Sequence, residues 1–228
     1  MKLNIILAAL AGAVFAAVTV FAVIDKNEMA RLAEELAFEE ETESVKPKRE
    51  VEKTAVITVT TKDKNYTGHV EEDYFVIDYC GIDADTITVP EEIEGYPVKK
   101  LGKLSFARRF CKNIVLPDSI EEIGERAFIN CEGLGSIKFG SGLKKIGGEA
   151  LKSCHVLKEV TFPDGMAELA DIVFAENEEL TVINIPGKDT KIGNPAEFET
   201  CPKAVIVTPA GSQADKIARE KKLPVENR

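Results

Sequence analysis

Two consecutive stretches of the chain carry the same pattern: IVLPDSIEEIGERAFINCEGLGS (residues 114–136) and IKFGSGLKKIGGEALKSCHVLKE (residues 137–159). Each opens with an apolar-x-apolar triplet, continues to an Ile-Gly pair, and ends with a cysteine and a leucine. Further copies begin at Val160 and Ile183, each 23 residues after the one before, and an irregular copy occupies residues 87–113. A period of this length indicates a solenoid in which each copy is one turn.

The apolar positions of the repeat explain why the copies must stack. A single turn has too few inward side chains to offset the entropy lost on ordering it, whereas stacked turns bury each other's faces. The triplet alternates as a short strand that the following proline ends, and the Ile-Gly pair ends a second extended piece. GERAFINC and GGEALKSC predict one or two helical turns. We therefore expect an α/β solenoid of about five turns, with short strands and short helical turns.

The first residues place the chain outside the cytoplasm. Residues 3–24, LNIILAALAGAVFAAVTVFAVI, carry no charge, and a helix of that length crosses a hydrocarbon layer of about 30 Å. This length favours a signal anchor at residues 1–24 that is not cleaved. A signal peptide cleaved near Ala22 stays open as the alternative, whereas a buried helix is disfavoured because no face is polar. Either way we expect an extracytoplasmic protein of the cell envelope, attached to the membrane by the N-terminal helix or secreted.

Four further regions follow the apolar segment, and they differ in composition. They are a charged helical linker (residues 25–50), an N-terminal β cap (51–86), the solenoid repeats (87–209) and a C-terminal capping helix (210–228). Ser212 is the expected N-cap of that helix, with Asp215 three residues later.

The string IxxPxxxxxIGxxAFxxCxxLxx resembles the repeat of the BspA-like leucine-rich repeat family of bacterial surface proteins. The stretch YFVIDYCGIDADTITVPEEIEGYPVKKLG is similar to the opening segment of that family, and VIVTPAGSQADKIAREKKLPV to its closing segment. The resemblance covers about residues 68–228. It implies display on the cell surface and, as for some members, adhesion to host proteins.

Composition and motifs argue against several other functions. With 39 acidic and 29 basic residues the net charge is -10, which disfavours nucleic acid and anionic membrane surfaces as partners. His155 follows Cys154, but neighbouring residues of a short helix point apart, and no third group orients the pair. Glu121 and Glu122 fit the solvated face of a solenoid better than an acid-base pair. We expect no enzyme activity, no cofactor, no metal site and no small-molecule substrate.

The five cysteines form an odd set without metal-ligand spacing. Cys131 and Cys154 share one slot of the repeat, so they lie about 4.8 Å apart, within reach of a disulfide. Asn177 fills the same slot in the next copy, which favours packing over redox chemistry. The copy at residues 87–113 lacks one residue near its end, which places Cys111 in the leucine slot.

One column of residues is the candidate binding surface. The middle residue of each triplet faces outward from the main sheet: Thr88, Val115, Lys138, Thr161 and Asn184. Repeat proteins bind through such continuous surfaces, although every solenoid has such a column, whether or not it binds a ligand. We expect a non-enzymatic module that binds another protein or a surface glycan. The alternative is a structural display or spacer element without a specific ligand, and an enzyme is the least supported function.

Overall fold

The computed structural model describes residues 58–60, 65–194, 198 and 200–228. The chain divides into two units, Met1–Glu50 and Val51–Arg228, and every described residue belongs to the second. The signal anchor expected at residues 1–24 and the linker expected at residues 25–50 lie outside the described residues. Within the described ranges, no helix is both long and apolar enough to span a bilayer.

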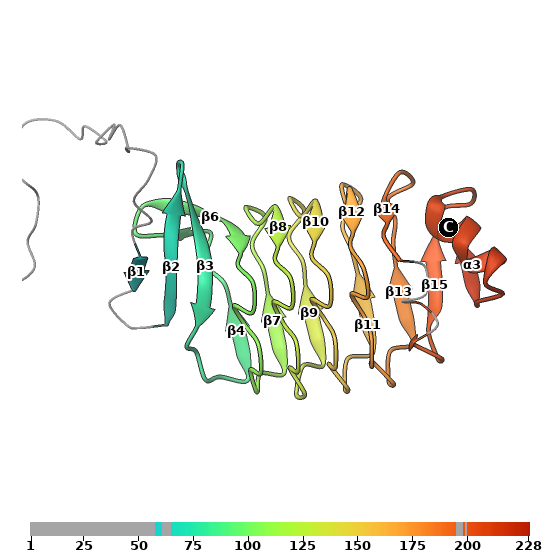
Figure 1. The fold of residues 1–228 in the computed structure, drawn as a ribbon, viewed down its shortest axis with the longest axis horizontal. Coiled ribbons are helices and arrows are strands. Elements are labelled where there is room, and N and C mark those ends of the chain that lie inside the picture. The colour runs from blue at the N-terminus through green and yellow to red at the C-terminus, as the bar shows by residue number, and fades with distance from the viewer. Residues whose placement is uncertain (1–57, 61–64, 195–197, 199) are drawn as a thin grey trace, which may run out of the picture. The chain divides into compact units, whose positions relative to one another are not determined.

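The repeats form a β-solenoid whose turns have three sides (Figure 1). The front side consists of the short parallel strands β4 (Thr86–Thr88), β7 (Asn113–Val115), β9 (Ser136–Lys138), β11 (Glu159–Thr161), β13 (Val182–Asn184) and β15 (Val205–Thr208). The back side consists of β6 (Tyr96–Leu101), β8 (Glu122–Ile123), β10 (Lys145–Ile146), β12 (Glu168–Leu169) and β14 (Lys191–Ile192). The third side, here the turn side, is formed by residues 103–108, 125–130, 148–153 and 171–176.

Strand pairing places residues one repeat apart next to each other. Ile114 of β7 is in register with Ile137 of β9, and Ile123 of β8 with Ile146 of β10, each pair 23 residues apart. The solenoid fold and its repeat length are thereby confirmed. The front side contains about six turns rather than the five expected, because β15 continues the ladder although its sequence lacks the Ile-Gly pair.

The repeated apolar side chains form one continuous core. The aromatic slot is fully buried in three successive turns, at Phe128, Leu151 and Phe174. The rings of Phe106 and Phe128 lie 5.3 Å apart between centroids, so successive turns pack directly on each other. The prediction that the periodic isoleucines and phenylalanines point toward a common axis is confirmed.

The turn side is not helical, and the prediction of short helical turns is wrong. Two residues per turn have left-handed backbone, as at Arg126 (φ 57°) and Asn130 (φ 57°), and this conformation interrupts a right-handed helix. The amide of Phe128 donates to the carbonyl of Ala150 in the next turn at 2.8 Å, where a helix would bond within the segment. Stacking between turns therefore overrides the local helical pattern. Within the described residues, α3 (Gln213–Glu220) is the one α-helix.

The cysteine slot connects neighbouring turns. The thiols of Cys131 and Cys154 donate to the carbonyls of Phe106 and Phe128, at 3.1 and 3.4 Å. All five cysteines are buried, so the predicted packing role is confirmed for this slot. Burial raises the pKa of the Cys131 thiol to about 12, which keeps it protonated and able to donate. Cys111 is buried as well, in agreement with its predicted place in the leucine slot.

Both ends of the solenoid carry additional strands. At the N-terminal end, β1 (Thr58–Thr60), β2 (Tyr66–Glu71) and β3 (Tyr74–Cys80) pair antiparallel, and β3 runs parallel to β6, which also forms a hairpin with β5 (Glu92–Ile93). At the C-terminal end, β16 (Val225–Asn227) extends the front sheet beyond β15. Ser212 caps α3 as predicted, accepting a hydrogen bond from the amide of Asp215.

The helix α3 protects the exposed edge of the back side. The side chain of Gln213 accepts a hydrogen bond from the amide of Ile192 at 3.1 Å, and it donates to the carbonyl of the same residue. These are the backbone groups that a further strand beside β14 would use. The amide side chain therefore takes the place of the next strand and blocks edge-to-edge association there.

Candidate functional site

The predicted front column is in register along most of its length. Thr88, Val115 and Lys138 are paired neighbours in one ladder, and Thr161 and Asn184 are paired neighbours in the next. The front side consists of two ladders, one from β4 to β9 and one from β11 to β16. Thr88, Lys138 and Thr161 are exposed, whereas Val115 and Asn184 are half-buried. The structure thus brings all five residues onto one side of the solenoid.

The residues beside this column are mostly small and polar. Asn113 donates to the hydroxyl of Thr86 at 3.2 Å, and Ser136 donates to the side-chain oxygen of Asn113 at 2.7 Å. These bonds run from turn to turn and hold the side chains in fixed positions. Lys138 has no ion pair within the described residues. The front side therefore combines β-branched and neutral polar groups with two charged ones, the ammonium of Lys138 and the carboxylate of Glu159.

The front side extends beyond the predicted column. The same register continues through Val207 of β15 to Glu226 of β16. Val207 keeps the 23-residue spacing from Asn184, and Pro209 keeps it from Pro186, so this part of the ladder could have been read from the repeat, whereas Glu226 lies outside the pattern. Val207 is buried, which means that the exposed column effectively ends near Asn184.

The back side carries a row of alternating charges. The residue before each inward isoleucine or leucine alternates between cation and anion, and the row is in register along the strands: Lys100, Glu122, Lys145, Glu168 and Lys191. Opposite charges directly across a ladder attract each other, whereas like charges there are destabilising. The alternation therefore stabilises the stack of turns.

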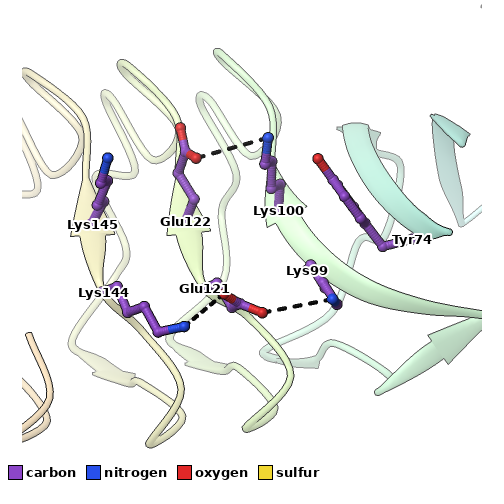
Figure 2. A pocket seen from close by; sticks show the side chains of 7 residues that line it. All are labelled: Tyr74, Lys99, Lys100, Glu121, Glu122, Lys144 and Lys145. Carbon is purple, nitrogen blue, oxygen red and sulfur yellow. Dashed lines mark hydrogen bonds and ion pairs between the residues drawn. The ribbon is translucent and has the colours of Figure 1, made fainter. Parts of the chain in front are cut away.

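A second row of charges runs alongside the first near the N-terminal end. Glu121 lies 2.8 Å from the ammonium of Lys144 and 3.8 Å from that of Lys99 (Figure 2). Together with Tyr74 and with Lys100, Glu122 and Lys145 of the first row, these residues line a shallow hollow on the back side. The ring of Tyr74 has the ammonium of Lys100 5.2 Å from its centroid.

The electrostatics of this hollow favour charged forms of Lys100 and Glu121 and the neutral form of Tyr74. Hydrogen bonds with Tyr74 and Glu71 raise the pKa of Lys100. A hydrogen bond from Lys144 lowers the pKa of Glu121. Burial raises the pKa of the Tyr74 phenol. Each charge is thus held by a neighbour of opposite sign, and no group is poised to exchange a proton near neutral pH.

Glu121 and Glu122 have a more defined role than the solvated face expected for them. The signal was present in the sequence, in the dipeptides before the isoleucine or leucine: KK at 99–100, EE at 121–122 and KK at 144–145. The alternation becomes visible once the copies are aligned and each column is read for charge.

The structure offers no assembled catalytic group among its described residues. The thiol of Cys154 is buried and donates to a backbone carbonyl, while His155 is exposed at the following corner. His69 lies 2.6 Å from Asp78 on the N-terminal strands, a pair that has no nucleophile in it. Within the described ranges, no group of three or more His, Cys, Asp or Glu side chains could hold a metal ion.

Comparisons with known proteins agree on the fold. The chain is similar to a leucine-rich repeat protein of T. pallidum, with a TM-score of 0.58 and 22% identity over 70% of this chain and 71% of that one. A leucine-rich repeat protein from Bacteroides capillosus gives a TM-score of 0.50 and 26% identity, over 57% of this chain and 99% of that one. The pneumococcal vaccine antigen PcpA gives 0.54 and 16%, over 68% and 50%. None of the curated proteins compared matches the sequence significantly.

The family comparison covers the solenoid itself. Residues 99–217 match the family described as BspA type leucine rich repeat region, in six copies. These are 119 of the 228 residues, and they include every strand of the back side except the first residues of β6. The chain therefore belongs to the BspA-type leucine-rich repeat family.

Proposed function

We propose that this chain is a non-enzymatic module of the cell envelope that binds another protein, or a surface glycan, through its front side. The observation that carries the proposal is the difference between the two strand-bearing sides. The back side has rows of charges that neutralise one another, whereas the front side presents Thr88 and Thr161 with few charges, among them Lys138, which has no ion pair within the described residues, and Glu159.

Desolvation favours the front side as the binding surface. A partner that covered the back side would remove water from an array of ions, and burying charges costs free energy unless new partners replace the water. Threonine, valine and asparagine side chains lose much less on burial. The centres of protein interfaces are correspondingly depleted in charged residues.

The solenoid also keeps the front side rigid. Backbone hydrogen bonds join successive turns along the back and turn sides and within each of the two front ladders, such as Leu116 to Lys138 and Gly124 to Leu101, at 2.9 and 2.7 Å. A surface that is already ordered loses little conformational entropy when a partner docks.

The location in the cell envelope is supported by the uncharged segment at residues 3–24. An intact anchor predicts that the chain is recovered with the membrane fraction and that its N-terminal peptide retains residues 1–24. Mass spectrometry of the mature N-terminus tests this directly. Recovery from the medium with an N-terminus near Val23 would show instead that the segment is a signal peptide cleaved near Ala22.

The binding function is tested by capture with the full-length chain in detergent. Envelope proteins, matrix proteins and a glycan array are exposed to the native chain and to Lys138→Glu and Thr161→Arg. We expect capture of a partner that both substitutions abolish, because they introduce charge and bulk at the centre of the front side. Lys216→Glu is the matched control, since this lysine is exposed on α3 and away from the front column.

The alternative is a spacer or display element without a specific ligand. It predicts that nothing is captured by any of the variants, while the chain still localises to the envelope. A catalytic function would require hydrolytic activity in the pure chain, which we do not expect from side chains arranged in this way.

A further inference from the structure

The charge of the chain is locally reversed in one segment. Residues 96–117 contain six cations and no Asp or Glu, in a chain whose net charge is -10. Four of the six are lysines that have ion pairs with carboxylates of neighbouring turns: Lys99, Lys100, Lys103 and Lys112. The remaining two, Arg108 and Arg109, have no carboxylate partner within the described residues.

The two arginines lie next to exposed apolar side chains. The guanidinium of Arg109 stacks over the ring of Tyr79, with 5.3 Å between the guanidinium carbon and the ring centroid. Phe110 follows directly and is 77% exposed, the highest value among the described large hydrophobic residues. Leu104 is 45% exposed and lines a hollow on the turn side together with Arg108.

The backbone that carries this cluster is fixed. Leu104 and Arg108 both have left-handed backbone, with φ of 62° and 59°. Their amides donate to the carbonyls of Glu125 and Ile129 in the next turn, at 3.1 and 2.9 Å. The arrangement is therefore part of the solenoid and is present before any partner binds.

One nitrogen of the Arg109 side chain lacks a hydrogen-bond partner. Its Nε atom is buried and has no hydrogen-bond partner within the described residues, while its Nη2 atom is 3.5 Å from the Tyr79 hydroxyl. The contacts with the ring and the hydroxyl of Tyr79 restrict the orientation of this guanidinium. A fixed guanidinium fork matches the two oxygens of a carboxylate.

We propose that Tyr79, Leu104, Arg108, Arg109 and Phe110, the arginine patch, bind an acidic segment of a partner protein. Carboxylates of the segment pair with the two guanidinium groups, and an adjacent aromatic or aliphatic side chain packs on Phe110 and Leu104. Arginine and aromatic residues are the types enriched where protein interfaces gain most of their free energy. This inference rests on the proposed protein-binding function and adds a second surface with a defined partner chemistry.

A short acidic peptide fits the patch better than an anionic membrane does. The rest of the chain has an excess of acidic residues, and a membrane would meet that excess beyond the patch. A peptide engages the patch without approaching the other sides. Phosphate polymers such as nucleic acids are bound by rows of cations, whereas only two cations of this segment lack a carboxylate partner.

The test measures fluorescence anisotropy with the full-length chain and a labelled peptide of repeated Glu-Asp-Phe triplets. We expect saturable binding that weakens with added salt, and no binding of the Gln-Asn-Phe counterpart. Arg108→Ala with Arg109→Ala, and separately Phe110→Ser, lower the affinity by about tenfold or more, because charge-assisted hydrogen bonds and apolar contact are lost. Lys188→Ala with Lys216→Ala removes the same charge elsewhere and leaves binding unchanged.

Different outcomes separate this inference from the proposed function. Equal loss of binding in the control pair overturns the patch, because it shows that overall charge decides. If vesicles that contain anionic lipid bind and the peptide does not, the choice of partner is overturned. Peptide binding that persists in Lys138→Glu shows that the patch acts apart from the front side. Capture of an envelope partner without any peptide binding leaves the proposed function standing and removes the patch. A melting curve for each variant confirms that the solenoid is folded.

Discussion

The side-chain oxygen of Asn177 accepts a hydrogen bond of 2.8 Å from the backbone amide of Cys154, one turn of the solenoid earlier. The amide group of the same side chain donates to the carbonyls of Leu151 and Phe174, both at 2.8 Å. Asn177 is completely buried, so these three bonds replace the water that its polar atoms and three backbone groups would otherwise bind.

Replacing Asn177 by Ala should destabilise the protein strongly. Three backbone groups lose their partners in a buried place, and we expect a fall of about 2–4 kcal/mol in the free energy of unfolding. Asn177→Cys should cost less, because the cysteines of this slot donate to the equivalent carbonyl in other turns. Urea unfolding of the two variants makes the comparison, and equal losses would contradict a hydrogen-bonding role for this slot.

The aromatic slot predicts a graded response to changes in side-chain size. Phe128→Ala leaves a cavity between the turns and should cost about 3–5 kcal/mol. Phe128→Leu should cost less than about 1.5 kcal/mol, because the next turn is built with Leu151 at this position. Thermal and urea unfolding measure the loss of stability in each variant. Similar losses for both variants would show that the ring contact with Phe106 matters more than the filled volume.

The period and the inward positions were predictable from the sequence because they depend on apolar residues alone. Isoleucine, leucine and phenylalanine recur wherever a side chain meets the axis, as at Ile123 and Ile146. The turn side was not predictable in this way. Its left-handed positions hold residues such as Leu104 and Glu149 and carry no glycine signature, so nothing in the local pattern opposed a helix.

The arginine patch escaped prediction for a different reason. The first copy is one residue short, so Leu101 pairs with Ile123 at a separation of 22 residues. Phe110 consequently stands where the next copy has Gly133, a position without a side chain in that copy. The repeat assigns no fixed residue type to this position, and only the three-dimensional stack shows that Phe110 faces solvent.

Reversing one charge of the back side should produce a salt-dependent loss of stability. Glu122→Lys places three cations in a row, because Lys100 and Lys145 are its neighbours in the ladder. We expect a loss larger than that of Glu122→Gln by about 0.5–1 kcal/mol at low salt. The difference should shrink at molar salt, where charges are screened over a few ångströms. A difference that is independent of salt would point to packing as its cause.

All five cysteines should resist alkylation in the folded protein. Each is buried, and burial raises the pKa of Cys80 to about 11 and that of Cys131 to about 12. Thiolate is the reactive form, so iodoacetamide near neutral pH should leave the native chain unmodified and label every cysteine in urea. Mass spectrometry counts the adducts. Rapid labelling of a native cysteine would show that the solenoid opens locally at that turn.

Acid should weaken the solenoid through ion pairs between turns. The carboxylate of Glu149 accepts hydrogen bonds from Arg126 at 2.9 and 3.2 Å, and these lower its pKa below the ordinary value of 4.5. A carboxyl with a lowered folded-state pKa contributes stability that is present above its unfolded-state pKa and is lost as the pH falls through the folded-state value. The free energy of unfolding should therefore decline as the pH falls below about 4.5.

The contribution of Glu149 can be separated from that of the other carboxylates. Glu149→Gln should lower stability at pH 7 and flatten the decline in acid, because the substituted amide does not titrate. Glu178→Gln is the control, since Glu178 is exposed and has no ion pair among the described residues. Urea unfolding at a series of pH values compares the slopes. If Glu149→Gln and the native chain lose stability in parallel as the pH falls, the Arg126 pair does not stabilise the stack, and the acid response arises at other carboxylates.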